Sequence, residues 1–198
     1  AWALENDLGD SSDVDFTEES GTLKNADPDT VSQRAIERGI DQVGTLGSGN
    51  HFCEVDVVEE IYDENTAEVF GLFRNQIVVQ IHTGSRGLGY QICDDYLKTI
   101  LRASNAYGFN LPDKQLACAP IKSKEGKEYL NAMQSAANFA WNNRQVIMHL
   151  AKKSFMQTFH MKESELGFKL VYDVCHNIAK IEEHIIDNES KKVCVHRK

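Results

Sequence analysis

The five cysteines of this 198-residue sequence are scattered along the chain, and no two of them form a C-x-x-C pair. This spacing excludes a zinc ribbon and argues against a disulfide framework, and it is typical of reduced thiols in the cytosol or nucleus. Long apolar runs are absent as well, so we expect neither a membrane span nor a signal peptide. The sequence therefore predicts a cytoplasmic or nuclear protein with no membrane partner.

Basic residues are the minority among the charges, with 21 Lys and Arg against 30 Asp and Glu and a formal net charge of -9. This balance argues against a protein that holds nucleic acid by general electrostatics, although it leaves room for a local basic cleft. Hydrophobic residues make up 41% of the chain, which is enough for a sizeable core. At this length the chain is one domain or a piece of a larger one.

A nucleotide-binding fingerprint is absent from residues 76–89, QIVVQIHTGSRGLG, because the glycines do not match G-x-G-x-x-G and no P-loop lysine follows. The stretch predicts a strand that ends at His82, a loop with Ser85 and Arg86, and a helix from about residue 88 or 90 to Tyr107. Such junctions present backbone N–H groups to anions, so Ser85 and Arg86 are candidate phosphate contacts and His82 a candidate ligand. The alternative is a glycine-rich turn with a surface arginine and a core histidine.

A second glycine-containing stretch, residues 44–58, reads GTLGSGNHFCEVDVV. It predicts a strand in which His51 and Cys53 share one face while Asn50, Phe52 and Glu54 share the other. These residues offer a metal ligand, a donor and an acceptor within one short element. The alternative is a strand that follows a flexible turn, with Glu54 in solvent.

A third stretch, residues 168–180, reads FKLVYDVCHNIAK and predicts a strand that ends at His176, followed by Asn177. Cys175 would point to the opposite side of that strand from His176, so we discount it as a co-ligand. The residues that follow, Glu182 to His184, are expected on a solvated face, and residues 191–196 in a short strand.

The remainder of the chain predicts supporting structure. Residues 5–22 are expected as a solvated acidic loop, and residues 59–71 as the end of a hairpin or a short helix. His149 and His160 are expected to be structural. Helices are predicted from a cap at Asp27 and Pro28 to Gly39, and over 123–159 with a break near Asn142 and Asn143.

His51, His82 and His176 share a setting, since each is predicted at the end of a strand and beside Gly or Asn. Neutral imidazoles from separate strands are a normal way to bind manganese or zinc. The three side chains would hold one metal, or would divide between two. A two-metal site suits phosphoryl transfer, because both the entering and the leaving oxygen are stabilised.

Four stretches in order, GTLGSGNHF (44–52), IHTGSRGLG (81–89), VYDVCHNIAK (171–180) and VHRK (195–198), closely resemble the RtcB-type RNA-splicing ligases. The resemblance covers nearly the whole chain from about Asp27 and is greatest to the eukaryotic branch. It implies an α+β fold of mixed sheets with flanking helices. Residues 27–198 would form an incomplete central portion of the catalytic domain, after an acidic and partly disordered segment, 1–26.

The resemblance implies an RNA ligase that uses GTP and Mn²⁺ to join a 2′,3′-cyclic phosphate or 3′-phosphate end to a 5′-hydroxyl end, as in tRNA splicing. It implies tRNA exon halves as substrates, and an archease-like activator and tRNA-ligase complex subunits as partners. His82 and His176 would share one manganese and His51 would hold the other. The remaining implied contacts are Asn50, Phe52, Glu54 and Asn177 to the guanine nucleotide, and Arg86 and Ser85 to RNA phosphate.

Two motifs of that family have no counterpart among the 198 residues. One is an Asp-x-x-Cys motif that supplies further metal ligands, and the other is the His-Gly-Ala-Gly-Arg stretch whose histidine is guanylylated. We therefore expect a large part of the metal and nucleotide pocket here, without formation of the covalent intermediate. Two alternatives remain: a metal-dependent phosphoesterase that uses water, against which the lack of Asp-rich metal motifs counts, and a non-catalytic fragment that acts as an interaction module.

Overall fold

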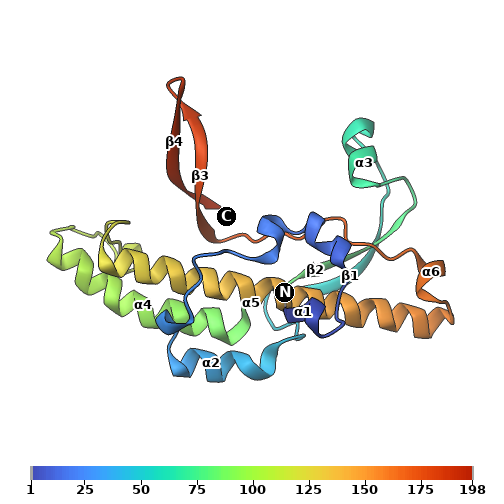
Figure 1. The fold of residues 1–198 in the computed structure, drawn as a ribbon, viewed down its shortest axis with the longest axis horizontal. Coiled ribbons are helices and arrows are strands. Elements are labelled where there is room, and N and C mark those ends of the chain that lie inside the picture. The colour runs from blue at the N-terminus through green and yellow to red at the C-terminus, as the bar shows by residue number, and fades with distance from the viewer. Residues whose placement is uncertain (1, 198) are drawn as a thin grey trace. The chain divides into compact units, whose positions relative to one another are not determined.

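The computed structural model describes residues 2–197, so Ala1 and Lys198, the last residue of the VHRK stretch, lie outside it. The described chain combines helices with two-stranded antiparallel sheets, which confirms the α+β prediction (Figure 1). It forms two units: the first contains residues 2–22, 42–86 and 139–174, and the second 23–41, 87–138 and 175–197. The predicted boundary between residues 26 and 27 stays a prediction. None of the described helices combines the length and hydropathy needed to cross a bilayer.

The first unit contains the antiparallel strands β1 (Phe52–Val57) and β2 (Ile77–His82), which confirms both predicted strands. Phe52 is paired with His82 at one end of the hairpin. The connection between the strands carries helix α3 (Glu64–Phe70), so the short-helix alternative for this region is correct. Asp63 caps α3 by accepting from the backbone N–H of Thr66, and Gly71 ends it with φ 67°.

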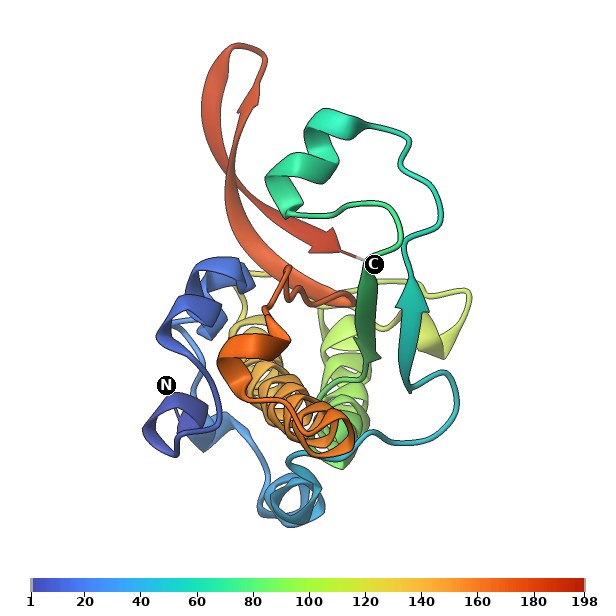
Figure 2. The same cartoon turned by 90° about the vertical axis from the view of Figure 1, so that its right-hand side faces the viewer.

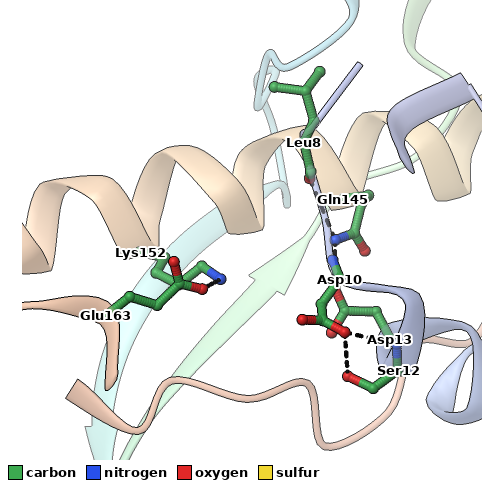
Figure 3. Close-up of polar contacts among 7 residues, drawn as sticks. All are labelled: Leu8, Asp10, Ser12, Asp13, Gln145, Lys152 and Glu163. Carbon is green, nitrogen blue, oxygen red and sulfur yellow. Dashed lines mark hydrogen bonds and ion pairs between the residues drawn. The ribbon is translucent and has the colours of Figure 1, made fainter. Parts of the chain in front are cut away.

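The acidic N-terminal segment forms short helical turns where the sequence predicts a loop: α1 (Trp2–Glu5), η1 (Ser11–Phe16) and η2 (Glu18–Gly21). Figure 3 shows how Gln145 holds this segment. Its Nε2 donates to Asp13 Oδ2 at 2.8 Å and to the Leu8 carbonyl at 3.4 Å. Gly9 allows the approach, because a Cβ there would lie 2.4 Å from Gln145 Nε2. A half-buried amide thus orders a stretch whose composition alone indicates solvated chain.

Helix α5 (Lys124–Phe159) runs unbroken for 36 residues, so the predicted break near Asn142 and Asn143 is wrong. Its first half belongs to the second unit and its later half to the first. Asparagine weakens a helix when its side chain competes for the local backbone. Here Asn142 instead accepts from the N–H of Ala3 at 3.2 Å. His160, with φ 54°, follows the last turn, and α6 (Glu163–Leu166) lies beyond it.

The strand predicted over residues 168–175 is also wrong, because the stretch is extended without forming a ladder. Its backbone pairs with the acidic turns at a single isolated bridge between Asp173 and Thr17. There the N–H of Glu18 donates to the Asp173 carbonyl at 2.8 Å, and the N–H of Asp173 donates to the Phe16 carbonyl at 2.9 Å. Strand-prone side chains cannot make a sheet when the neighbouring backbone is a 3-10 turn.

The helices of the second unit are η3 (Pro28–Thr30), α2 (Gln33–Gly39), η5 (Lys114–Leu116) and the first half of α5. Helix α4 (Arg86–Ala106) also belongs to this unit, except for Arg86. The short turn η4 (Ile40–Gln42) lies where the first and second units divide. The predicted helix from Asp27 divides in two, because Ser32 caps α2 separately; the end at Gly39 is confirmed. The predicted helix to about Tyr107 is confirmed as α4, although it begins earlier, at Arg86. The buried core of this unit consists of Ala35, Ile92, Ala132 and Ala136, with Val31, Leu88 and Tyr96 packed against it.

The second unit also contains the hairpin of β3 (Ile178–Ile186) and β4 (Glu189–Arg197), drawn in orange and red in Figure 2. Asp187 and Asn188 both have positive φ and make its two-residue turn. The short strand predicted over 191–196 is confirmed within β4. Glu182 departs from the predicted solvated face, since its side chain is only 18% exposed and accepts from Arg197 Nη2 at 2.6 Å.

Candidate functional site

Two glycine-containing loops meet at one end of the β1–β2 hairpin. We call residues 44–50, which lead into β1, the first loop, and residues 83–85, which leave β2, the second loop. Because the strands are antiparallel with Phe52 opposite His82, the loops lie at the same end of the hairpin. The ring centroids of His51 and His82 are 6.1 Å apart in an edge-on arrangement, and those of Phe52 and His82 are 5.2 Å apart. The structure thus brings two of the predicted histidines together.

Asn143 of α5 holds both loops, and sequence reasoning missed it. The side chain is fully buried. Its Oδ1 accepts from the N–H groups of Gly44 at 2.7 Å and Thr45 at 3.1 Å, and its Nδ2 donates to the carbonyls of Thr45 at 3.1 Å and Gly84 at 3.0 Å. The local sequence gives no signal that singles it out, because Asn142, Arg144 and Gln145 beside it are polar as well.

Thr83 and Arg144 add further contacts to the second loop. Thr83 is buried, and its hydroxyl donates to the Leu46 carbonyl of the first loop. The Thr83 carbonyl accepts from Arg144 Nη1 at 3.1 Å. Arg144 also donates through Nε to Asp173 Oδ1 at 2.6 Å. Burial raises the pKa of Asp173 to about 6, and the opposing effect of Arg144 only partly offsets it.

Arg86 lies beside His51, and Gly47 makes room for both. Arg86 Nε donates to Thr45 Oγ1 at 3.1 Å, which fixes one edge of the guanidinium. Gly47 has φ +109°, and a Cβ at this position would lie 2.1 Å from Arg86 Nη1 and 2.4 Å from His51 Nδ1. Glycine is therefore required here both for the backbone conformation and for the close approach of the two side chains.

His51 carries a ring nitrogen suited to a metal. Its Nδ1 is buried and has no hydrogen-bond partner within residues 2–197. Burial lowers the pKa of His51, and the nearby Arg86 and His82 lower it further. A neutral imidazole is the form that binds transition metals, so the His51 ring fits a metal ligand, and the His82 ring lies close to it. Among the described residues, no group of three or more His, Cys, Asp or Glu side chains is placed to hold a metal.

Five other predicted site residues each have their own surroundings. His176 and Asn177 belong to the second unit and are exposed, with Asn177 Nδ2 at 2.9 Å from His176 Nδ1. Asn50 and Glu54 are exposed at the start of β1, and Ser85 is half-buried in the second loop. The roles of all five stay predictions.

A hollow of about 300 Å³ lies around α3 and contains none of the candidate residues. We place the candidate site at the two loops, because two imidazole groups lie there beside a guanidinium, whereas no histidine lines the hollow. The hollow is lined by Glu60, Ile61, Glu64, Leu72, Phe73 and Arg74.

A family model described as tRNA-splicing ligase RtcB matches residues 1–198. The chain belongs to the RtcB family. It is 54% identical to the tRNA-splicing ligase RtcB of Methanocaldococcus jannaschii, 52% identical to that of Archaeoglobus fulgidus and 50% identical to that of Thermococcus kodakarensis. Each match covers 100% of this chain, which spans 20%, 41% and 41% of those three relatives respectively.

Membership of the RtcB family confirms the resemblance found in the sequence motifs. All three RtcB relatives described above are archaeal. The greater likeness to the eukaryotic branch, and the place of this stretch within a complete RtcB catalytic domain, stay predictions.

Proposed function

We propose that the protein carrying this sequence is an RNA ligase of tRNA splicing that joins a 2′,3′-cyclic phosphate or 3′-phosphate end to a 5′-hydroxyl end with GTP and Mn²⁺. The observation that carries the proposal is the cluster of His51, His82 and Arg86 at the common end of β1 and β2. Two imidazoles and a guanidinium in one place suit a metal and a phosphate. Family membership supplies the class of reaction, since the relatives are named tRNA-splicing ligases.

In this proposal His51 holds one manganese, and His82 shares the other with His176. Bound manganese would stabilise negative charge on the oxygens of the reacting phosphate. The Nδ1 atom of His51, buried and without a partner among the described residues, supports this role because a metal would satisfy it. Burial, Arg86 and His82 lower the pKa of His51, which favours the unprotonated ring that a metal requires.

Arg86, with Ser85, would bind RNA phosphate. The guanidinium matches two phosphate oxygens with parallel N–H donors. Because Thr45 engages Nε, the terminal nitrogens are held in a fixed orientation rather than sampling many. Ser85 precedes Arg86 directly at the start of α4, where backbone N–H groups favour an anion.

The guanine nucleotide would contact Asn50 through its phosphate and Glu54 through its base, with Phe52 and Asn177 lining the same pocket. Asn50 and Glu54 are exposed, so they are accessible to a ligand. We further propose that the covalently bound GMP is carried by a histidine in a motif that these 198 residues do not contain. These residues alone would then take up no label from GTP.

The proposal places the protein in the cytoplasm or nucleus, with tRNA exon halves as substrates. An archease-like activator and tRNA-ligase complex subunits are the proposed protein partners. The net charge of -9 favours local contacts to RNA phosphate, such as those of Arg86, over general electrostatic attraction.

A ligation assay on the natural protein that carries this sequence tests the function. Two labelled RNAs, one ending in a 2′,3′-cyclic phosphate and the other beginning with a 5′-hydroxyl, are incubated with GTP and Mn²⁺. We expect a joined product that requires both GTP and Mn²⁺. An opened cyclic phosphate without joining, independent of GTP, would show a phosphoesterase instead. Unchanged RNAs would leave the interaction-module alternative.

A further inference from the structure

We infer that Asn143 is a positioning residue, which sets the place of the two loops relative to each other and thereby the aim of His51, His82 and Arg86. The inference rests on the proposed function and deepens it, because it assigns a role to a residue that touches neither metal nor RNA.

Each end of the Asn143 amide has a separate task. The Oδ1 atom accepts from the N–H groups of Gly44 and Thr45, which belong to the first loop. The Nδ2 atom donates to the Thr45 carbonyl and also to the Gly84 carbonyl of the second loop. One fully buried side chain therefore links two loops that are 33 residues or more apart along the chain.

The hydrogen bonds of Asn143 to the two loops lie next to the candidate ligands in the sequence. Gly84 is two residues from His82 and from Arg86, and the first loop ends at the residue before His51. Thr45, which Asn143 contacts on both sides, also receives the hydrogen bond from Arg86 Nε. A shift of the Asn143 amide would therefore move the guanidinium and both imidazoles. Arg144, the next residue, holds the Thr83 carbonyl at 3.1 Å and strengthens the same link.

A different asparagine of α5 shows what a purely structural contact looks like. In the second unit, Asn138 Oδ1 accepts from the Leu23 N–H at 2.8 Å, and its Nδ2 donates to the Leu23 carbonyl at 3.1 Å. Asn138 thus uses the same groups as Asn143, and these two hydrogen bonds go to Leu23, which belongs to neither loop. It is the matched control for a substitution at Asn143.

The substitution Asn143→Asp separates the two tasks of the amide. A carboxylate keeps an acceptor for the N–H groups of Gly44 and Thr45, but it places a second oxygen against the carbonyls of Thr45 and Gly84. Two acceptors in contact repel when buried. The first loop keeps the hydrogen bonds from the N–H groups of Gly44 and Thr45, while the second loop loses the bond at the Gly84 carbonyl and keeps the one from Arg144 to Thr83. Asn138→Asp has the same chemical change and leaves both loops in place.

The test compares Mn²⁺ binding by calorimetry, ligation kcat and melting temperature in the natural protein, its Asn143→Asp variant and its Asn138→Asp variant, well below the melting point. We expect Asn143→Asp to weaken Mn²⁺ binding and to lower kcat by about 10- to 100-fold, as is typical of residues that orient metal ligands. Asn138→Asp is expected to lower the melting temperature without changing either quantity per folded molecule.

The outcomes separate the inference from the proposed function. Equal Mn²⁺ affinity and kcat in the two variants overturns the inference alone, since a structural residue would act only through the folded fraction. A wild-type protein that binds no Mn²⁺ and joins no RNA overturns the proposed function, and the inference with it.

If Asn143→Asp does not fold, the variant Thr83→Val tests whether the link between the two loops controls Mn²⁺ binding. It removes the Thr83 hydroxyl bond to Leu46, the second link between the loops, and conserves side-chain shape. Weaker Mn²⁺ binding in Thr83→Val supports the inference, and unchanged binding overturns it.

Discussion

His51 and Arg86 both lie close to Gly47 in the candidate site. The absence of a side chain at Gly47 lets an imidazole and a guanidinium lie against the same stretch of backbone. The guanidinium lowers the pKa of His51 in addition to the effect of burial. In the proposed site, the positively charged Arg86 would bind a phosphate and the neutral His51 ring would bind a metal. With the two side chains side by side, phosphate and metal could bind together.

Gly47→Ala is expected to weaken both Mn²⁺ binding and RNA ligation in the natural protein. The new methyl group would lie 2.1 Å from Arg86 Nη1 and 2.4 Å from His51 Nδ1, so both side chains must move. The positive φ adds about 1–2 kcal/mol of backbone strain. Calorimetric titration with Mn²⁺ and the rate of joined product measure the loss, which we expect to be about tenfold or more.

Gly49→Ala is the matched control for Gly47→Ala. Gly49 also has positive φ, +79°, but a Cβ there meets nothing within 4 Å. It carries similar backbone strain without displacing His51 or Arg86. Equal losses of Mn²⁺ affinity in the two variants would show that strain in the first loop, and not the contact of Gly47, matters.

At the scale of elements, α5 shows how far the sequence pattern reaches. The spacing of apolar residues predicts the extent of the helix, 123–159, almost to the residue. The same reading takes Asn143 for a helix breaker, because asparagine in isolation prefers turns. Its actual partners, Gly44 and Thr45, lie 99 and 98 residues earlier in the chain. Contacts between residues so far apart in the chain cannot be predicted from the pattern of neighbouring residues.

The extended stretch before His176 shows the same limit. Residues 168–175 have strand-prone side chains, but a strand also needs a backbone partner in register. The acidic turns supply it only at the Thr17–Asp173 bridge. Strands β1 and β2 were predictable because the residues between them allow the two to meet as a hairpin, with α3 accommodated in the connection.

The ion pair of Asp173 with Arg144 links this extended stretch to the second loop and predicts a pH-dependent stability. Burial raises the pKa of Asp173 from 3.8 to about 6, Arg144 lowers it, and Glu18 raises it. With a raised pKa in the folded state, the stabilising contribution of Asp173 is complete below about pH 4 and is lost as the pH rises through about 6. The loss is at most about 3 kcal/mol, since one pKa unit corresponds to about 1.4 kcal/mol.

Urea unfolding of wild type and Asp173→Asn between pH 4 and pH 7 measures this dependence. We expect the difference in unfolding free energy between wild type and variant to shift against the wild type as the pH rises. Asp10→Asn is a suitable control, because this carboxyl group is exposed and its pKa is lowered by the N–H of Ser12. A constant difference between wild type and Asp173→Asn across this range would contradict the assignment.

In the molecule as a whole, the sequence identified candidate site residues better than it identified which of them lie close together. Glycine-flanked histidines at strand ends made His51 and His82 candidates, and the antiparallel register places the two rings near each other. His176 is equally prominent in the sequence but lies in the second unit, before β3 and not at the end of a strand. The reaction itself could not be predicted from periodicity or spacing, because the same groups serve hydrolysis and ligation. Motif resemblance supplied it.

Whether His51 and His82 hold the metal is tested by calorimetric titration of the metal-free natural protein with Mn²⁺. The titration compares wild type with His51→Ala, His82→Ala and His160→Asn. The last is the control, since His160 is exposed at the end of α5 with a φ of 54° that asparagine tolerates. The account predicts that each of the two alanine variants weakens Mn²⁺ binding by about 100-fold or more, while His160→Asn binds as wild type does. Wild-type affinity in folded His51→Ala and His82→Ala proteins would contradict the claim that these two histidines hold the metal.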